Sequence, residues 1–416
     1  MITSKEINSI INISESFQLI EKFMQILLSD KKDETFDRFI EIENDLSYDW
    51  FTDYFQEEHS NRKAMMQDFT PKEVANLLPR FSQGFTSVLD ICAGTGGLSI
   101  GAWNKNPDAF FVCEELSERA LPLLLFNMAI RNVDGYIVNK EVLSGQTKQV
   151  FRLQKAEKYS SITVENEEPQ KTDFELVIEN PPYSLKYKWD HIPDYMDGYG
   201  EPPTSRADYA FIVYGISRLS DKGSLCAILP HGVLFRGQKE QQIRKEILKR
   251  QRVKTIIGLP DKLFKNTDIP TAIIIIGRGD NNVLFIDASR DFLKESKHNV
   301  LRGEDIEKII QAEVSRVDID RYSRSVSLSE IEENGFNLNI SQYVDTHIPE
   351  PLPDAGELLR DLMNIDDQIQ RSENELAKML KNLVTNNADD KVILKEFIKY
   401  LKKKDGAIYE QLTLDL

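Results

Sequence analysis

The sequence predicts an α/β protein with a doubly wound, mostly parallel sheet, and two observations carry this prediction. From about residue 65 onward, short apolar segments alternate with helical segments, which is the pattern of βαβ units. One apolar strand also ends in a glycine-rich turn that opens a helix, at 88–98. The seven expected strands are 86–92, 109–115, 135–141, 174–180, 224–230, 253–259 and 271–277.

The ends and interruptions of this pattern complete the predicted sheet. The last two expected strands are joined by a short connection, so we expect them to form an antiparallel hairpin. One further strand is expected at 283–287. The polar stretch 145–172 separates the third and fourth strands, and we expect it to be an excursion on the surface.

Helical segments flank the predicted sheet domain, which spans 63–346. The region 1–62 shows apolar residues at helical spacing, namely Ile20, Phe23, Met24, Leu27 and Leu28. In 347–416 a proline-bearing linker precedes a helical tail. Four apolar residues of the tail recur every seven positions, namely Leu362, Ile369, Leu376 and Leu383. This repeat predicts either a helix that folds back on the chain or one that docks on a partner.

The composition indicates a globular protein of the cytoplasm. The chain has 416 residues, of which 41% are hydrophobic and 29% charged. Its longest aliphatic run, 271–276, is too short to span a membrane, and its first residues lack the features of a secretory signal. The three cysteines have no metal-ligand spacing, so we expect reduced core thiols and no metal site.

The formal net charge of −16 restricts how this chain could bind nucleic acid. A protein that binds DNA alone usually has a basic surface, so any DNA contact must be local or shared with a basic partner. The segment 239–254 holds seven basic and two acidic residues. It is predicted to be either a DNA contact or a solvated helix face.

The glycine-rich turn is typical of a nucleotide-type binding loop. Its glycines allow the backbone to approach a ligand closely. The spacing departs from the dinucleotide fingerprint and fits S-adenosylmethionine better, with Asp90 near the sulfonium or amino group. The residues of this candidate loop are Asp90, Ala93, Gly94, Thr95, Gly96 and Gly97.

Acidic residues end the next two strands. An acid at the end of the second strand is where such sheets bind ribose hydroxyls, and we prefer Glu115 to Glu114 for this role. Glu141 ends the third strand and is either an acceptor for an adenine amino group or a surface acid. Upstream, Thr70, Pro71 and Glu73 predict a capping box, and the helix N-terminus could bind a carboxylate.

Asn180-Pro181-Pro182-Tyr183 is the most informative motif. It follows a buried strand, and the prolines fix a rigid loop without N–H donors. The loop therefore presents the side-chain oxygen of Asn180 and the carbonyl of Pro181, followed by an aromatic ring. Two acceptors beside an aromatic ring suit a planar base that carries an exocyclic amino group.

These motifs together resemble the N6-adenine DNA methyltransferases, and most of all the modification subunit of type I restriction–modification systems. The resemblance covers about two thirds of the chain. It is carried by the segments 69–71, 90–97, 180–183, 206–211, 229–235, 257–260, 269–271 and 337–340, together with Glu115 and Phe264. The family often has phenylalanine where this chain has Tyr183, a change that keeps the stacking ring.

The resemblance implies a seven-stranded, Rossmann-like methyltransferase core and an S-adenosylmethionine site. It adds to the cofactor site the residues Gln67, Asp68, Phe69, Thr70, Pro71 and Lys72. It makes 180–183 catalytic, with the flipped adenine between Tyr183 and Phe264. The chain has no Pro-Cys dipeptide, which argues against methylation at C5 of cytosine. The resemblance also implies a cytoplasmic protein encoded by a bacterium, a phage or a mobile element.

Several alternatives remain open from the sequence. Enzymes that methylate glutamine side chains or RNA amino groups use the same tetrapeptide, and a silent binding subunit is a further alternative. No target-recognition domain is evident, which favours a separate specificity subunit docked at 355–385, with a restriction subunit as a possible third component. A solitary methyltransferase would instead read DNA through 145–172 and through an aromatic loop that contains Tyr187, Trp189, Tyr195 and Tyr199.

Overall fold

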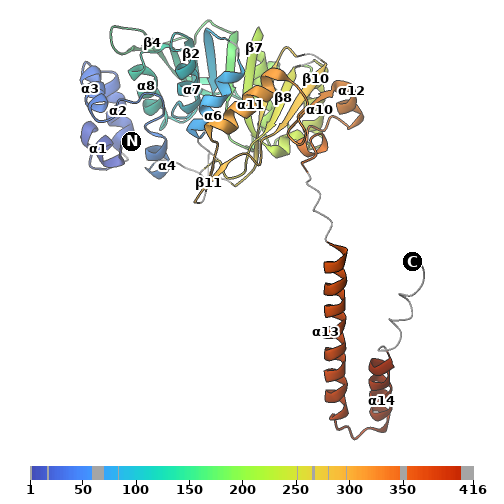
Figure 1. The fold of residues 1–416 in the computed structure, drawn as a ribbon. Helices are drawn as coiled ribbons and strands as arrows, with labels where there is room; N and C mark the ends of the chain where they lie inside the picture. The colour runs from blue at the N-terminus through green and yellow to red at the C-terminus, as the bar shows by residue number, and fades with distance from the viewer. Residues whose placement is uncertain are drawn as a thin grey trace. The chain divides into compact units, whose positions relative to one another are not determined.

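The computed structural model describes residues 2–15, 18–58, 70–82, 84–250, 252–264, 268–279, 281–296, 298–346 and 354–403. The chain divides into two compact units, Met1–Thr346 and His347–Leu416, and each is described by itself (Figure 1). Within the described ranges, no helix combines the length and the apolar character needed to cross a membrane.

A single large sheet forms the centre of the first unit. Every one of the seven strands expected from the sequence is present, and their bounds are β1 (Ser87–Ile91), β2 (Phe110–Glu115), β3 (Asp134–Glu141), β6 (Phe174–Glu179), β7 (Leu219–Pro230), β8 (Val253–Gly258) and β9 (Thr271–Gly277). Their spatial order is β8-β9-β7-β6-β1-β2-β3. The strands from β7 to β3 in this order are parallel, whereas β9 is antiparallel to both β7 and β8. The predicted antiparallel hairpin is thus confirmed.

The sheet is longer than the seven strands that we predicted. The stretch 145–172 is a correction, because it contains β4 (Gln146–Gln154) and β5 (Ser161–Glu165), which extend the sheet beyond β3. Only Val150, Phe151 and Leu153 of β4 are buried, and this sparse signal hid the strand among polar residues. At the other end, β10 (Asn282–Asp287) is the further strand expected at 283–287 and pairs with β8, and β13 (Ser323–Ser327) adds an edge.

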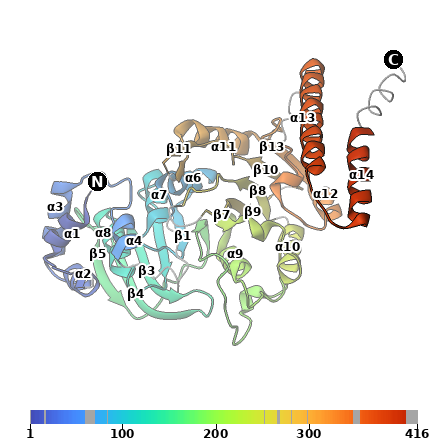
Figure 2. The ribbon, with the colours of Figure 1, turned by 90° about the horizontal axis from the view of Figure 1, so that it is seen from below.

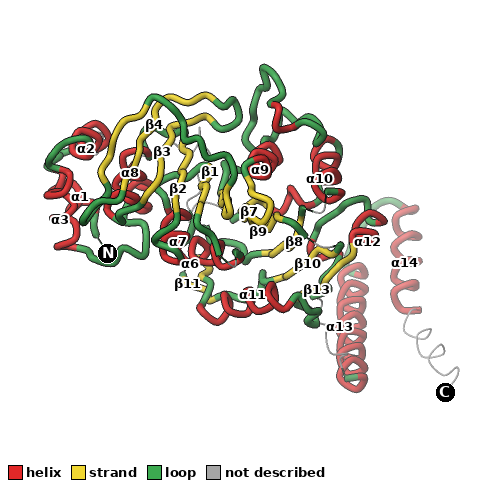
Figure 3. Tube along the Cα trace, turned by 90° about the horizontal axis from the view of Figure 1, so that it is seen from above, coloured by secondary structure: helices red, strands yellow, loops and turns green. Residues whose placement is uncertain are grey.

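Helices cover both faces of the sheet (Figure 3). One face carries α6 (Lys72–Leu77), α7 (Gly97–Lys105), α8 (Leu121–Ile130) and α11 (Gly303–Ser315). The other face carries α9 (Asp208–Ser217) and α10 (Lys239–Lys249), and α12 (Leu328–Glu333) packs on the same side. Strands buried on both faces explain the continuous apolar runs that predicted a parallel sheet. A small separate hairpin consists of β11 (Leu293–Glu295) and β12 (His298–Val300).

The N-terminal helices share the core of the sheet domain. They are α1 (Ser4–Ile11), α2 (Leu19–Leu27), α3 (Lys32–Ile42) and α4 (Thr52–Glu58) (Figure 2). The rings of Phe23, Phe36, Phe39 and Phe51 surround Phe126 of α8, with ring centroids 4.7–5.1 Å from it. Because all five rings are fully buried, the N-terminal helices are built into the same hydrophobic core.

The basic segment 239–254 has tertiary roles that the sequence does not reveal. Arg244 is buried and donates hydrogen bonds of 2.6–3.0 Å to three backbone carbonyls. The guanidinium of Arg250 lies 3.9 Å from the ring centre of Tyr199, and Lys239 pairs with Glu201 at 2.9 Å. These contacts hold surrounding loops, so much of the basic segment already binds groups of the same chain.

The second unit is a helical hairpin of α13 (Ala355–Lys381) and α14 (Ala388–Lys403), which pack against each other. The predicted heptad positions lie mostly on α13. Their side chains stay between 42% and 57% exposed, at Leu362, Ile369, Leu376 and Leu383. An apolar row therefore remains open to solvent although α14 folds back on α13.

Candidate active site

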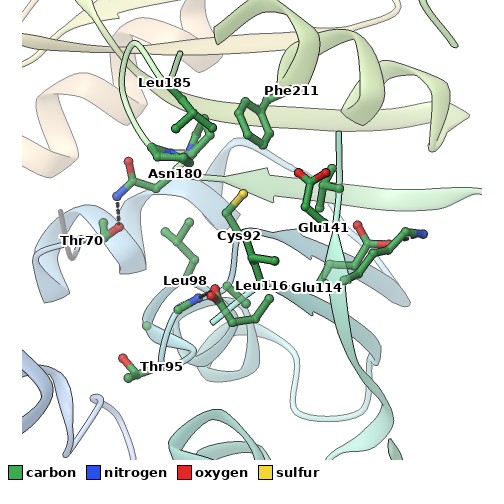
Figure 4. A pocket seen from close by; sticks show the side chains of 18 of the residues that line it. Thr70, Cys92, Thr95, Leu98, Glu114, Leu116, Glu141, Asn180, Leu185 and Phe211 are labelled. Atoms are coloured by element: carbon green, nitrogen blue, oxygen red, sulfur yellow. Dashed lines mark hydrogen bonds and ion pairs between the residues drawn. The ribbon is translucent and has the colours of Figure 1, made fainter. Parts of the chain in front are cut away.

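A cavity of about 300 Å³ opens at the carboxyl ends of the central strands (Figure 4). Open α/β sheets bind ligands at this edge, and pockets of this size hold small organic molecules. Within the described residues, no group of three or more His, Cys, Asp and Glu side chains could hold a metal ion. Of the residues singled out in the sequence, the cavity is lined by Thr70, Ala93, Gly94, Thr95, Gly97, Glu115, Glu141, Asn180, Pro181 and Pro182.

The glycine-rich turn forms one wall of the cavity. Gly94 and Gly96 have φ values of +59° and +98°, which L side chains rarely adopt. A Cβ at Gly96 would also lie 2.9 Å from Leu124 Cδ1. The turn therefore requires glycine at both positions, and α7 begins directly after it at Gly97.

Glu115 holds this turn in place. Its carboxylate accepts hydrogen bonds from the backbone N–H groups of Gly94 at 2.7 Å and Ser117 at 2.6 Å. Burial raises the pKa of Glu115. Glu114 also lines the cavity, but it faces the other side of the sheet, where it accepts from Tyr214 Oη at 2.9 Å. Of these two acids, Glu115 binds the glycine-rich turn through its carboxylate, whereas Glu114 contacts it through its backbone carbonyl, which accepts from the Ala93 N–H at 2.9 Å.

Asp90 lies behind the turn and is not among the residues that line the cavity. Side chains alternate along β1, and that of Asp90 points toward α7, where Oδ2 accepts from Ser99 Oγ at 2.6 Å. Its second oxygen is buried and has no hydrogen-bond partner in the described structure. Burial raises the pKa of Asp90 to about 7. The expected contact of this carboxylate with a cofactor sulfonium or amino group does not match this placement.

The predicted capping box at Thr70 is wrong. Helix α6 begins at Lys72 with Pro71 as its N-cap, and no side chain caps it. Thr70 Oγ1 instead accepts a hydrogen bond from Asn180 Nδ2 at 3.0 Å (Figure 4). Lys72 points toward the N-terminal region, where Nζ donates to Ser47 Oγ at 3.1 Å. Gln67, Asp68 and Phe69 lie outside the described residues.

Asn180, Pro181 and Pro182 form the opposite wall, where β6 ends, whereas Tyr183 and Phe264 are not among the lining residues. Tyr183 Oη donates to Asn180 Oδ1 at 2.8 Å. Together with Thr70, this bond fixes both ends of the Asn180 side-chain amide, so its oxygen and nitrogen have assigned directions. The ring of Tyr183 meets that of Phe264 edge to face, with centroids 6.4 Å apart and planes at 80°.

Glu141 lies at the far end of the cavity from Asn180 (Figure 4). Its Oε2 accepts from Tyr187 Oη at 2.7 Å and from the Ser144 N–H at 2.9 Å. The rings of Tyr187 and Trp189 pack together with centroids 4.6 Å apart. The aromatic loop predicted from the sequence is therefore anchored to this end of the cavity.

Comparison with known proteins assigns the family. A family model for N-6 DNA Methylase matches residues 44–350. The chain belongs to the N-6 DNA methylase family. The resemblance predicted from the motifs is thereby confirmed.

Related proteins support the same assignment. The type I restriction enzyme MpnII methylase subunit of Mycoplasma pneumoniae is 27% identical over 334 residues, which cover 76% of this chain and 59% of that protein. The type I restriction enzyme HindI methylase subunit of Haemophilus influenzae is 27% identical over 362 residues, with 81% and 76% covered. The chain spans about three fifths of the length of several such relatives.

A solved structure confirms the predicted methyltransferase fold. The type I restriction-modification system methyltransferase subunit from Streptococcus thermophilus matches with a TM-score of 0.58 and 33% identity. The match covers 67% of this chain and 59% of that one.

In this N-6 DNA methylase family member, the N-terminal region also builds the site, which the sequence did not predict. Thr52 lines the cavity. Asp49 accepts hydrogen bonds from Thr95 Oγ1 in the glycine-rich turn, from Thr52 Oγ1 at 2.6 Å and from Asn127 Nδ2 at 2.7 Å. Asn127 donates as well to the Thr95 carbonyl at 2.8 Å. Asp49 thus joins the N-terminal region to the turn.

Arg131 supports this connection from α8. Its buried guanidinium donates to the carbonyls of Leu46 at 2.9 Å and Tyr48 at 2.7 Å. Burial lowers the pKa of Arg131 to about 10, while the nearby charges of Asp49 and Asp45 favour its protonated form. The only sequence signal for this network is a pair of polar residues, Asn127 and Arg131, in the otherwise apolar segment 121–131.

We predict that Asp49→Ala weakens cofactor binding by about tenfold. The change leaves buried donors without an acceptor and frees the glycine-rich turn, and such losses cost roughly 1–3 kcal/mol. Calorimetric titration with S-adenosylmethionine measures the effect. Asp49→Asn should recover only part of the affinity, because one amide oxygen still accepts from both threonine hydroxyls while the amide NH2 group faces the donors of Asn127 and Phe51. Asp53→Ala, which removes an exposed acid on α4, is the control; equal affinities in all three variants would contradict the role of Asp49.

Glu179 generates a prediction about pH. Both of its oxygens are buried and have no hydrogen-bond partner within the described residues, and burial raises its pKa to about 8 from a usual 4.5. Between these pH values the folded state binds one more proton than the unfolded state, so the free energy of unfolding falls as the pH rises. Glu179→Gln should therefore raise the melting temperature by at least about 3 °C at pH 8.5 and leave it unchanged near pH 4.5.

A matched control for that measurement lies on the same strand. The Glu175 carboxylate accepts hydrogen bonds from the backbone N–H and hydroxyl of Thr86, and these lower its pKa. Glu175→Gln should thus destabilise the protein at pH 8.5, with the opposite sign to Glu179→Gln. Differential scanning calorimetry at both pH values measures the melting temperatures. If the melting temperatures of the two variants shifted in the same direction at pH 8.5, the interpretation of Glu179 would be contradicted.

Proposed function

We propose that this protein transfers a methyl group from S-adenosylmethionine to N6 of an adenine in DNA, as the modification subunit of a type I restriction–modification complex. One observation carries the proposal: the amide of Asn180 is fixed from both ends at one wall of a cavity whose other wall is a glycine-rich turn. Membership of the N-6 DNA methylase family and the likeness to type I methylase subunits support it.

The cavity fits S-adenosylmethionine, which supplies an electrophilic methyl group on its sulfonium. The turn at Gly94 and Gly96 exposes backbone along one wall. Glu115 and Glu141 line the cavity, and we propose their carboxylate oxygens as acceptors for the ribose hydroxyls and the adenine amino group. Thr70 and Asn180 lie at the opposite end from Glu141, so we propose that end for the methyl group (Figure 4). Gln67 to Lys72 remain proposed members of this site on the resemblance alone.

The side chain of Asn180 and the carbonyl of Pro181 act on the target amino group. The lone pair of an adenine N6 is delocalised into the ring, which makes it a poor nucleophile. Hydrogen bonds from the two N6–H groups to these oxygens favour a pyramidal nitrogen and so localise the lone pair. Because the pyramidal form exists only near the transition state, the bonds raise the rate of transfer more than they strengthen binding.

The aromatic residues of the site act on the base. Adenine within a duplex is out of reach, so it must be flipped out to meet Asn180. A base that stacks on Tyr183 requires the Phe264 ring to turn away from the edge contact that it now makes. In the proposed complex Phe264 then lies against the other face of the base.

We predict that Asn180→Ala loses methyl transfer to DNA by at least about 100-fold while cofactor affinity changes by less than threefold. Thr70→Val should lower methyl transfer less, by about tenfold. It releases only the nitrogen end of the Asn180 amide and leaves the hydrogen bond from Tyr183 to its oxygen. Transfer of labelled methyl groups by the assembled complex measures both variants. Wild-type turnover by Asn180→Ala would refute the catalytic assignment.

The same assay separates the alternatives for the substrate. Wild-type protein is incubated with labelled cofactor and with duplex DNA, RNA or cell protein in separate reactions. Label that enters the DNA and is recovered as N6-methyladenine after acid hydrolysis supports the proposal. Label only in protein or only in RNA would replace it with amino-group methylation of glutamine or of RNA.

The charge and the helical hairpin support a partner that reads the DNA sequence. The chain carries a net charge of −16, and much of its basic segment at 239–254 is occupied within the chain. DNA binding therefore needs positive charge from another subunit. The exposed apolar row on α13 is the proposed docking surface for a specificity subunit.

We predict that Ile369→Asp prevents association with the specificity subunit. A carboxylate in the centre of the apolar row would have to be buried without a partner, which costs several kcal/mol. Co-expression of both subunits followed by affinity capture measures association. Asn364→Asp adds the same charge on another face of α13 and should leave the complex intact. Normal capture of Ile369→Asp would rule out docking through this row, and unchanged cofactor binding would show that the first unit is folded.

A further inference from the structure

The residue that follows the proposed catalytic tetrapeptide has a strained backbone. Ser184 has a φ of +54°, in the left-handed region that residues with a Cβ rarely adopt. A glycine would adopt this conformation without strain, but residue 184 is a serine. A left-handed residue directly after Tyr183 sets the direction in which the chain leaves the active site, and it persists only if neighbouring groups hold it.

Asp208 holds this conformation from the first position of α9. Its side chain is fully buried, and Oδ1 accepts a hydrogen bond from the Ser184 backbone N–H at 2.8 Å. One residue before it, the Ala207 N–H donates to the Leu185 carbonyl at 2.9 Å. The start of α9 thus binds two consecutive residues of the chain as it leaves the tetrapeptide.

Arg236 completes the connection from the segment after β7. Its Nη1 lies 3.2 Å from Asp208 Oδ2 and 3.3 Å from Glu240 Oε1. Its Nη2 donates to Ser184 Oγ at 3.3 Å. One guanidinium therefore binds both the side chain of Ser184 and the carboxylate that binds the Ser184 backbone.

These residues do not belong to the cofactor site. Asp208, Ser184 and Arg236 are absent from the lining of the cavity. Asp208 lies in the segment 206–211, and Arg236 directly follows 229–235. Both segments contribute to the family resemblance, but the proposed mechanism gives them no role.

We propose that Asp208 is a positioning residue for methyl transfer, which acts through Ser184 on Tyr183 and, through the Tyr183 hydroxyl, on Asn180. This inference rests on the proposed catalytic role of residues 180–183. When Asp208 cannot accept, Ser184 relaxes to a right-handed or extended backbone, and the neighbouring Tyr183 ring leaves its place. The bond from Tyr183 Oη to Asn180 Oδ1 is lost with it.

A purely structural role for the buried Asp208–Arg236 pair leads to different results. In that case Asp208 variants lose stability, cofactor affinity and activity together, and a change at residue 184 restores none of them. Positioning instead lowers kcat for methyl transfer and leaves cofactor affinity unchanged. It also predicts that glycine at 184, which adopts positive φ without strain, compensates for the loss of Asp208.

The test compares Asp208→Ala, Asp208→Asn, Ser184→Gly and the double variant Asp208→Ala/Ser184→Gly, each in the assembled complex. We measure kcat at saturating cofactor and DNA, cofactor affinity by calorimetry, and the melting temperature. Asp208→Ala should lower kcat at least 30-fold with cofactor affinity within threefold. Asp208→Asn keeps an oxygen for the Ser184 N–H and should lose less than fivefold. The double variant should recover at least about fivefold over Asp208→Ala.

The outcomes separate this inference from the proposed function. No methyl transfer to DNA by the wild-type complex overturns the proposed function. Activity that disappears in Asn180→Ala but persists in Asp208→Ala overturns only the positioning role. So does a double variant no more active than Asp208→Ala, or a loss of kcat matched by the loss of cofactor affinity. If Asp208→Ala does not fold, Asp208→Leu, which is similar in size to aspartate but has no acceptor, is compared with and without Ser184→Gly, and failure of glycine to raise kcat again overturns the role.

Discussion

Parallel pairing of β1 with β2 on one side and with β6 on the other is the constraint on which the site depends. Ile91 at the end of β1 is level with Glu114 of β2 and with Glu179 of β6. The turns that follow these strands therefore start at the same edge of the sheet. This register brings the glycine-rich turn and the residues Asn180, Pro181 and Pro182 to opposite walls of one cavity, although more than eighty residues separate them in the chain.

The central strands and most of the cavity wall were predictable because their signals are local. A strand buried on both faces is a continuous apolar run, and a turn with positive φ needs glycine, so both features can be read from a short window. The strand β4 gave no such signal, because only three of its residues, Val150, Phe151 and Leu153, are buried. Contacts between distant segments were also invisible, and these explain the errors at Thr70 and Asp90, whose side chains find partners in Asn180 and Ser99.

The same reason explains why the role of the N-terminal region was missed. From the sequence it is a set of amphipathic helices with a boundary near residue 62. In the structure Thr52 belongs to the wall of the cavity, and Asp49 binds the turn through Thr95. The piece of chain that builds the site therefore begins well before the first strand. Exchange of methyltransferase cores between relatives would have to carry residues 45–58 along with the sheet.

The edge contact between Tyr183 and Phe264 has a consequence for how a base gains entry. The buried Phe264 ring occupies a position beside Tyr183 and competes for it with any other ring. Because Phe264 belongs to the same chain, this competition does not weaken when the protein is diluted. In the proposed function, an incoming base has to displace it, and the apparent affinity of every base is lowered by the same factor. A planar ring can compensate by stacking on Tyr183, whereas water or a flexible side chain cannot. Under that proposal, the resting contact selects flat aromatic substrates before any hydrogen bond to Asn180 forms.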